Sequence, residues 1–382
     1  MSTRRYDIAV IGAGVFGAWT AWRLQQLGKE VVLLDVHGPA NARASSGGES
    51  RIIRMGYGPD ELYARWSARS LELWREFSRQ IRQTLFHRTG VLWMAAPGNM
   101  YVAGAYEVLS KLGVPVERLS TADLQRRYPQ TNFEDVEWGF LEPESGVLMA
   151  RRAVQAVVEA AVKEGVAYLS VTAGAPDARD PTSVPTHEGD TVVAETFIYC
   201  CGPWLPRIFP ELLGERIFPT RQEVFFFGTP PGSSEFLPPR MPTWIDLDTE
   251  TYGMPDLENR GFKIALDRHG PPFDPEDGLR MVSPESLSVV QKRLAHRFPA
   301  LANAPVLETR VCQYENTSNG DFLIDQHPEF QNVWLVGGGS GHGFKHGPVV
   351  GEYVANLILG VGQREPRFSL ATKATIKKRA VF

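Results

Sequence analysis

The stretch Asp7-Ile-Ala-Val-Ile-Gly12-Ala-Gly14-Val-Phe-Gly17 decides the fold of this chain. Its apolar first half predicts a buried strand, and residues 14–27 predict a helix that Gly28 ends in a left-handed conformation. Gly12 permits a tight turn, Gly14 lets a pyrophosphate approach the amides at the helix start, and Gly17 lets the helix pack on the strand. The pattern predicts an α/β fold with a Rossmann-like nucleotide site.

Asp35 completes this motif. It ends the second apolar strand, residues 31–34, and lies 18 positions after Gly17 (35 − 17). A carboxylate at this place accepts hydrogen bonds from ribose hydroxyls. A glycine-rich turn without a ligand is the alternative, and the complete strand, helix and acid argue against it. The motif does not decide between NAD and FAD.

A second glycine-rich junction lies near the C-terminus. Gly337-Gly-Gly-Ser-Gly-His-Gly343 follows an apolar strand at 333–336 and precedes a helix opened by Pro348. A flavin needs its ring held as well as its pyrophosphate. A helix N-terminus aimed at the pyrimidine carbonyl would stabilise the negative charge that reduction places there. The second junction therefore favours FAD, and its candidate contacts are Gly339, Gly341 and Gly343.

Composition argues against several kinds of partner. The chain has 382 residues, 43% of them hydrophobic and 22% charged, with a net charge of −4. This balance is typical of a globular protein and offers no basic field to nucleic acid or to a membrane. No apolar stretch is long enough to span a bilayer, and the glycines within residues 8–18 argue against a cleaved leader. Three cysteines do not form a disulfide framework, so we expect a cytoplasmic protein, and we expect a monomer.

The remaining elements follow from periodicity and turn signals. Helices are predicted at 62–77, 151–164 and 284–298, the last with Ser283 as its N-cap. Strands are predicted at 167–171, 197–201, 225–227, 243–245 and 262–266. Residues 175–187, rich in Pro, Asp, Ser and Thr, predict a surface loop. The region 216–305 reads as a sheet-rich insertion between two nucleotide-binding segments.

Three further segments resemble the monomeric sarcosine oxidase family of FAD-dependent amine oxidases. They are Ser46-Gly-Gly-Glu-Ser-Arg-Ile-Ile-Arg54, Val311-Cys-Gln-Tyr314 with Phe322-Leu-Ile-Asp325, and Ser340-Gly-His-Gly-Phe-Lys345. They follow the family's order along nearly the whole chain. The first and last strings are fairly specific, and the middle segments match loosely.

The resemblance implies two domains. The first is a doubly wound FAD-binding domain made of residues 1–78, 145–215 and 318–382. The second, a substrate domain made of residues 79–144 and 216–317, has a mixed, largely antiparallel sheet that lies over the flavin.

The resemblance also implies a carboxylate clamp. Arg51 would lie near the flavin ring, while Arg54 and Lys345 would hold the substrate carboxylate, one as a bidentate fork and the other as a point charge. The alternative is that these side chains are solvated surface cations. Arg54 lies in an apolar Ile-Ile-Arg-Met run, where an unpaired charge is rare.

Lys263, Tyr252 and Tyr314 match further family positions. Lys263 lies in the apolar stretch Gly261-Phe-Lys-Ile-Ala-Leu266, and its counterpart speeds the reaction of reduced flavin with oxygen by stabilising negative charge. On an edge strand the same lysine would only face solvent. The two tyrosines match residues that border the substrate cavity, and ordinary packing is their alternative.

Cys312 matches a cysteine that carries the flavin covalently in the resembling enzymes. A thiolate is needed for this reaction, and Arg51 or Arg310 could stabilise it. The alternative is a small buried hydrophobe. We expect core positions for the adjacent Cys200 and Cys201.

Two positions depart from the family's pattern. The family often has histidine where this chain has Gly47, beside the flavin, and its loss weakens the case for covalent attachment. The family commonly has histidine where this chain has Asp267, beside the substrate. Asp267 places an anion there and so changes the preferred amine, and His269 could partly replace the imidazole.

The resemblance implies FAD-dependent oxidation of the C–N bond of a small secondary amine amino acid, sarcosine-like, N-methyl or cyclic, to an imine. Its partners would be a small carboxylate-bearing amine and molecular oxygen, which would be reduced to hydrogen peroxide. One alternative is a flavin dehydrogenase of a related amino or 2-hydroxy acid that passes electrons to a carrier. Another is a non-catalytic flavoprotein relay subunit. His342 and His346 are four positions apart but lack further ligands, so we expect no metal site.

Overall fold

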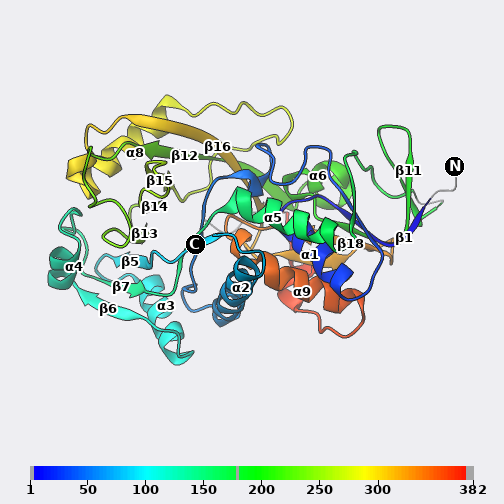
Figure 1. The fold of residues 1–382 in the computed structure, drawn as a ribbon, viewed down its shortest axis with the longest axis horizontal. Helices are drawn as coiled ribbons and strands as arrows, with labels where there is room; N and C mark the ends of the chain where they lie inside the picture. Colours follow the sequence, from blue (N-terminus) through cyan, green and yellow to red (C-terminus); the bar gives the residue numbers. More distant parts are fainter. Residues whose placement is uncertain (1–3, 178–179, 376–382) are drawn as a thin grey trace.

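The computed structural model describes residues 4–177 and 180–375 (Figure 1). Its helices are α1 (Val15–Gln26), α2 (Glu61–Gln80), α3 (Met100–Lys111), α4 (Thr121–Arg127), α5 (Ala150–Lys163), α6 (Leu205–Ile208), α7 (Pro210–Leu213), α8 (Pro284–Arg297) and α9 (Gly347–Ile358). Two short 3₁₀ turns, η1 (Ser45–Gly47) and η4 (Phe344–His346), lie beside the site described below.

The first sheet is the nucleotide-binding sheet that the opening motif predicts. It has the strand order β17 (Leu323–Gln326), β18 (Val333–Gly337), β11 (Thr191–Tyr199), β1 (Arg5–Ile11), β2 (Val31–Leu34) and β9 (Ala167–Leu169), and β10 (Ser183–Pro185) pairs with β11. The five strands from β18 to β9 are parallel, and β17 and β10 are antiparallel additions. The carboxyl ends of parallel strands meet at one edge, where such sheets bind ligands.

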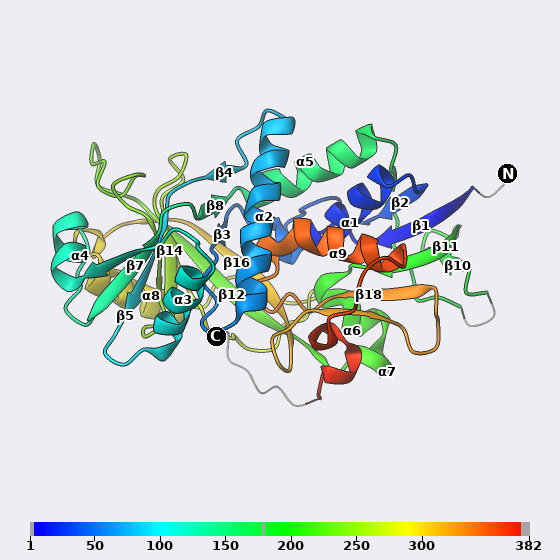
Figure 2. The ribbon, with the colours of Figure 1, turned by 90° about the horizontal axis from the view of Figure 1, so that it is seen from below.

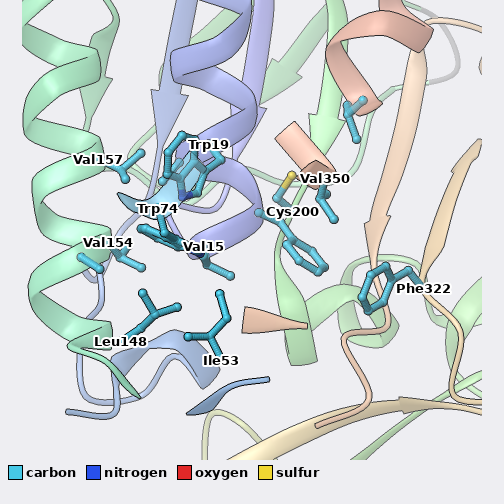
Figure 3. Close-up of a cluster of buried hydrophobic side chains, with 14 of the residues drawn as sticks. Val15, Trp19, Ile53, Trp74, Leu148, Val154, Val157, Cys200, Phe322 and Val350 are labelled. Atoms are coloured by element: carbon cyan, nitrogen blue, oxygen red, sulfur yellow. The ribbon is translucent and has the colours of Figure 1, made fainter. Parts of the chain in front are cut away.

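Three helices share one apolar core beside this sheet. Figure 2 shows α1 lying between α5 and α9. Most of their buried apolar side chains belong to a single hydrophobic cluster, and Figure 3 shows its members Val15, Trp19, Val154, Val157 and Val350. This core fixes the start of α1, and therefore the glycine-rich turn, relative to the strands.

The second sheet forms the other half of the molecule (Figure 1). Its order is β16 (Val306–Thr317), β12 (Ile217–Phe227), β15 (Phe262–Leu266), β14 (Thr251–Met254), β13 (Thr243–Asp246), β5 (Val91–Ala95), β7 (Trp138–Glu142) and β6 (Glu117–Ser120). All neighbours are antiparallel except β13 and β5. The expected mixed, largely antiparallel sheet is confirmed.

A small third sheet lies between the two halves (Figure 2). It consists of β3 (Arg51–Ile53), β8 (Gly146–Leu148) and β4 (Phe86–His87). Arg51 pairs with Leu148 in its register. This sheet carries the Arg-Ile-Ile-Arg segment to the boundary between the two large sheets.

Most predicted elements are confirmed, and the differences have local causes. Residues 183–185 form β10 inside the expected loop, because they hydrogen-bond to residues 191–193 at the start of β11, ahead of the part of β11 that pairs with β18. Residues 178–179 of this loop lie outside the described residues. β12 extends well beyond the predicted residues 225–227, and β16 was not predicted as a strand; polar residues continue the two strands as one antiparallel ladder. The residue boundaries of the two domains stay a prediction.

Candidate active site

A cavity of about 660 Å³ lies at the carboxyl ends of the parallel strands. The last residues of β1 and β2, together with Cys200 after β11 and Val336 in β18, contribute to its wall. It is also lined by eight of the nine predicted cofactor residues, namely Gly12, Gly14, Asp35, Arg51, Cys312, Gly339, Gly341 and Gly343.

Gly17, the ninth predicted cofactor residue, packs the helix on the strand. A Cβ there would lie 1.8 Å from the carbonyl oxygen of Gly12, which itself has a φ of 102°. Asp35 fastens the same turn, because its carboxylate accepts hydrogen bonds from the amides of Ala13 at 2.8 Å and His37 at 2.9 Å. Burial raises the pKa of Asp35, and these amides oppose the rise. Asp35 therefore holds the loop while it lines the cavity.

The cavity fits FAD at both ends. At one end Gly14 is the N-cap of α1 and offers no side chain to cover the amides of the first turn, which suits a pyrophosphate. At the other end the late glycine junction approaches Tyr314 closely, and a Cβ on Gly341 would lie 2.7 Å from its ring. The volume lies within the usual range of roughly 300–1,000 Å³ for ligand sites.

A second cavity of about 70 Å³ adjoins the first. The two share five lining residues, Arg51, Cys312, Tyr314, Gly341 and Phe344. Every predicted substrate-binding and catalytic residue lines the second cavity, namely Arg54, Tyr252, Lys263, Asp267, Tyr314 and Lys345. His269, which we expected as a partial replacement for the family's histidine, is half-buried outside this lining.

Arg54 is buried, with 4% of its surface exposed, so it is not a surface cation. Its guanidinium lies 4.5 Å from the ring centroid of Tyr57 and 4.9 Å from that of Trp93. It also donates to the carbonyl of Gly56. Contacts of this kind hold a cation in a low-dielectric site.

Glu142 organises the surroundings of Arg54, and it was not identified from the sequence. Its fully buried carboxylate accepts from the amides of Met55 at 2.7 Å and Gly56 at 3.0 Å, and from Trp93 Nε1 at 2.7 Å. The hydroxyl of Ser145 is a fourth donor. A lone carboxylate at the end of the apolar strand Trp138–Glu142 is the signal that could have identified it, as for Lys263.

Lys345 is also buried, with 4% exposed. Its Nζ donates to the hydroxyl of Tyr57 at 2.8 Å and to the carbonyl of His342 at 3.0 Å. Burial, and then the charge of Arg54, lower its pKa well below the usual value, while Asp267 raises it. Two basic side chains thus line one small cavity, an arrangement that can hold an anion.

Asp267 is the anion facing these cations. Burial raises its pKa to about 6, and the charges of Arg54 and Lys345 oppose the rise. Its Oδ1 accepts from the hydroxyl of Tyr314 at 3.4 Å. Burial, and then the charge of Asp267, also raise the pKa of Tyr252, so that phenol stays neutral. The cavity therefore carries both signs of charge.

Lys263 lies in the interior, because β15 is a central strand with neighbours on both sides. Only 3% of it is exposed, and its Nζ donates to the carbonyl oxygen of Ser50 at 3.0 Å and to its hydroxyl at 3.2 Å. Burial, and then the charge of Arg51, lower its pKa well below the usual value. The alternative of a solvent-facing edge lysine is wrong.

Arg51 lies against Cys312. Its guanidinium donates to the sulfur at 3.2 Å and to the carbonyl of Ser45 at 2.7 Å. Arg310, the other candidate cation, instead pairs with Glu49 at 3.1 Å. Cys200 is buried, and all three cysteines are free thiols.

Gly47 has a steric reason to lack a side chain. A Cβ at this position would lie 1.8 Å from the carbonyl oxygen of Asn41, within the turn that leads into η1. A histidine would require this turn to move.

His342 and His346 both lie within hydrogen-bond distance of one phenol. The Tyr57 hydroxyl lies 3.2 Å from Nδ1 of His342 and 2.8 Å from Nε2 of His346. Within residues 4–177 and 180–375, no group of three or more His, Cys, Asp or Glu side chains is arranged to hold a metal ion. No helix in the described part of the chain has the length and apolarity to cross a membrane.

Comparison with known proteins assigns the chain to a family. Residues 7–357 match the FAD dependent oxidoreductase family. The chain is 32% identical to a monomeric sarcosine oxidase of Streptomyces avermitilis over 93% of this chain and 94% of that protein. It is 29% identical to an N-methyl-L-tryptophan oxidase of Salmonella typhi, over 96% of this chain and 97% of that protein.

The fold comparison agrees. The structure of an L-proline dehydrogenase from P. horikoshii superposes with a TM-score of 0.84 at 21% identity, over 96% of this chain and 97% of that one. The predicted resemblance and the expected cofactor are confirmed. The chain belongs to the monomeric sarcosine oxidase family of FAD-dependent oxidoreductases.

Proposed function

We propose that this enzyme oxidises the C–N bond of a small secondary amine amino acid to an imine and reduces oxygen to hydrogen peroxide. The observation that carries the proposal is the charge arrangement of the small cavity, where Arg54 and Lys345 face Asp267 beside the flavin cavity. Two buried cations suit a carboxylate, and the anion suits the amine of the same substrate. The sarcosine and N-methyltryptophan oxidases that resemble the chain have substrates of this class by name.

The substrate is held by its ends. Arg54 and Lys345 bind its carboxylate, so that the carbon of its C–N bond is fixed toward the flavin cavity. Tyr252 and Tyr314 shape the remaining walls of the small cavity. Bound FAD would supply the two-electron acceptor for the hydride equivalent of the substrate C–H bond. The nitrogen lone pair forms the C=N bond, and water then hydrolyses the imine product.

Asp267 manages the proton of the amine. The substrate amine enters from water as an ammonium. It must lose a proton before the hydride leaves, because the C=N bond is formed by the nitrogen lone pair. The ionised carboxylate of Asp267 accepts that N–H proton. Its pKa of about 6 keeps the carboxyl group ionised at neutral pH. A histidine at this place would not offer the same negative charge, so we propose a substrate whose amine benefits from an anion.

Lys263 favours an oxidase over a dehydrogenase. Its Nζ lies in the interior, held by Ser50, and lines the small cavity. Oxygen gains negative charge as it is reduced to peroxide, and a fixed ammonium nearby stabilises that charge. The proposal further includes a thioether from Cys312 to a methyl carbon of the flavin. The thiol proton and one methyl hydrogen would be lost, and the two electrons released would pass through the flavin to oxygen. Arg51 donates to the sulfur and would stabilise the thiolate. We also propose a cytoplasmic monomer, with which three free thiols agree.

Anaerobic flavin bleaching across a panel of substrates tests the proposal. The panel contains N-methyl and cyclic amino acids, their decarboxylated analogues and 2-hydroxy acids. Rapid bleaching by the amino acids, followed by one peroxide per turnover in air, is expected. Bleaching by 2-hydroxy acids alone would support the dehydrogenase, and a flavin that no compound bleaches would support the relay subunit.

A further inference from the structure

Glu315 is a buried carboxylate that the proposed reaction does not use. It lies near the end of β16, one residue after Tyr314, and 8% of it is exposed. Its Oε1 accepts the amide of Gly339 at 3.2 Å. Its Oε2 is buried and has no hydrogen-bond partner among the residues that the structure describes.

Such an oxygen is costly unless a ligand pairs with it. Buried polar atoms in folded proteins nearly always have a partner, because the hydrogen bonds lost from water are otherwise not replaced. Burial raises the pKa of Glu315 to about 7, against the amides of Gly339 and Gly338. The carboxyl is therefore suited to a partner that both donates and accepts, as a hydroxyl does.

The carboxylate faces the cofactor cavity. Added Cβ atoms on Gly202 and Gly337 would lie 3.6 Å and 3.2 Å from Oε2, and one on Gly339 would lie 3.2 Å from Oε1. Glu315, Gly202 and Gly339 all line the large cavity. Three glycines thus border the carboxylate without side chains, and two of them line the cavity together with Glu315.

Its position along the cavity selects one part of the cofactor. The pyrophosphate loop begins at Gly12, and the two cavities meet at Cys312 and Tyr314. Glu315 lines the large cavity but not the small one. An anionic phosphate repels a carboxylate, whereas the ribityl chain between phosphate and ring carries hydroxyls.

We propose that Glu315 binds a ribityl hydroxyl of FAD through Oε2, with Oε1 held by the amide of Gly339. This contact concerns the cofactor alone and does not rest on the proposed substrate. It would make Glu315 a cofactor-binding residue and leave it out of amine chemistry.

The test measures FAD affinity in the apoprotein. Cys312→Ser is the background for every variant, so that no thioether interferes, and quenching of flavin fluorescence reports the dissociation constant. Glu315→Leu should weaken FAD binding about 10-fold or more, the size expected for a lost charged hydrogen bond. Glu308→Leu, near the start of the same strand, where the carboxylate pairs with Arg260 and is 34% exposed, should bind as the background does. The melting temperatures of the apoproteins control for folding.

FAD analogues that each lack one ribityl hydroxyl locate the contact. The Cys312→Ser protein with Glu315 intact (the Glu315 protein) should bind one analogue about 10-fold more weakly than FAD. The Glu315→Leu variant should bind that analogue and FAD equally well. Equal affinity of the Glu315 protein for FAD and all analogues would overturn the proposal, and this measurement needs no variant at Glu315. An unchanged dissociation constant in folded Glu315→Leu would overturn it as well.

Discussion

The two cavities are built by different means. The large one is formed mainly by backbone, at the ends of neighbouring parallel strands and at two glycine-rich turns. The small one is formed largely by side chains, the charged and aromatic ones among them, from β3, β12, β13, β14, β15, β16 and η4, which come from distant parts of the sequence. A contiguous motif therefore specifies where the cofactor binds, whereas the substrate cavity depends on long-range packing. Substitutions should fail in correspondingly different ways.

Gly17→Val should give the largest effect, because it breaks the backbone cavity. The new side chain would meet the carbonyl oxygen of Gly12 at the Cβ position, 1.8 Å away, and would push α1 off the strand. We expect a protein without bound flavin, with a loss of stability of roughly 1–3 kcal/mol from overpacking. Flavin absorbance per chain and thermal unfolding measure both.

A matched control exists at the other end of the same helix. Gly28 has a φ of 83° and open space around its Cβ position. Gly28→Asn, a residue that tolerates this conformation, should keep a full complement of flavin. Full flavin in Gly17→Val would mean that the turn does not depend on close packing of helix and strand.

Arg54→Ala should weaken binding of the substrate carboxylate while the flavin stays bound. Removing one partner of a desolvated charge pair costs on the order of 2–5 kcal/mol, so kcat/KM should fall steeply, and Arg54→Lys should fall less. Steady-state kinetics with a carboxylated substrate and its decarboxylated analogue make the test specific. Equal losses for the two compounds would show that Arg54 does not bind the carboxylate.

The same contrast explains how far the sequence could lead. Gly12, Gly17 and Asp35 act within one short motif, so their places followed from spacing alone. Lys263 was identifiable as a charge inside an apolar strand. The supports of Arg54 were not, because Trp93 and Glu142 come from strands β5 and β7, which the sequence pattern did not predict.

Position 47 shows another limit. The sequence shows that a histidine is missing there, but the reason is a contact with Asn41 that only the folded turn reveals. Glu315 is similar, since its burial depends on β16, a strand that was not predicted, and on glycines from two other segments. A backbone motif is specified by neighbouring residues, whereas the surroundings of a buried charge depend on tertiary contacts between distant segments.

Lys263→Met should slow flavin reoxidation while anaerobic reduction stays nearly intact. Loss of one preorganised charge at a developing anion costs about 10²- to 10³-fold in rate. Stopped-flow mixing of the reduced enzyme with oxygen measures this step. Lys292→Met, on an exposed face of α8, is the control for a general change in charge. If reoxidation keeps its wild-type rate, Lys263 serves packing alone.

Cys312 should hold FAD covalently, and its loss should affect attachment more than turnover. In acid-denatured wild type, the intact chain should carry the added mass of FAD, and Cys312→Ser should not. Cys200→Ser, another buried thiol lining the same cavity, should keep the added mass. Release of all flavin into the acid supernatant of the wild type would leave Cys312 as a buried thiol beside a non-covalent cofactor.

Asp267→Asn should have the smallest effect on the fold, and the size of this effect depends on pH. The folded pKa of about 6 lies above the ordinary value of 3.8, so the folded state binds this proton more tightly than the unfolded state does. Stability contributed by this group is therefore full below pH 3.8 and is lost as pH rises through about 6. Asp267→Asn should raise the melting temperature of the substrate-free protein above pH 6, on the order of 2 °C, and should change it little near pH 4. The same variant should lose activity for amines, and its kcat/KM should no longer fall as pH drops through about 6, as the wild type's should. A melting difference that is the same at both pH values would show that Asp267 is not the strained anion of the small cavity.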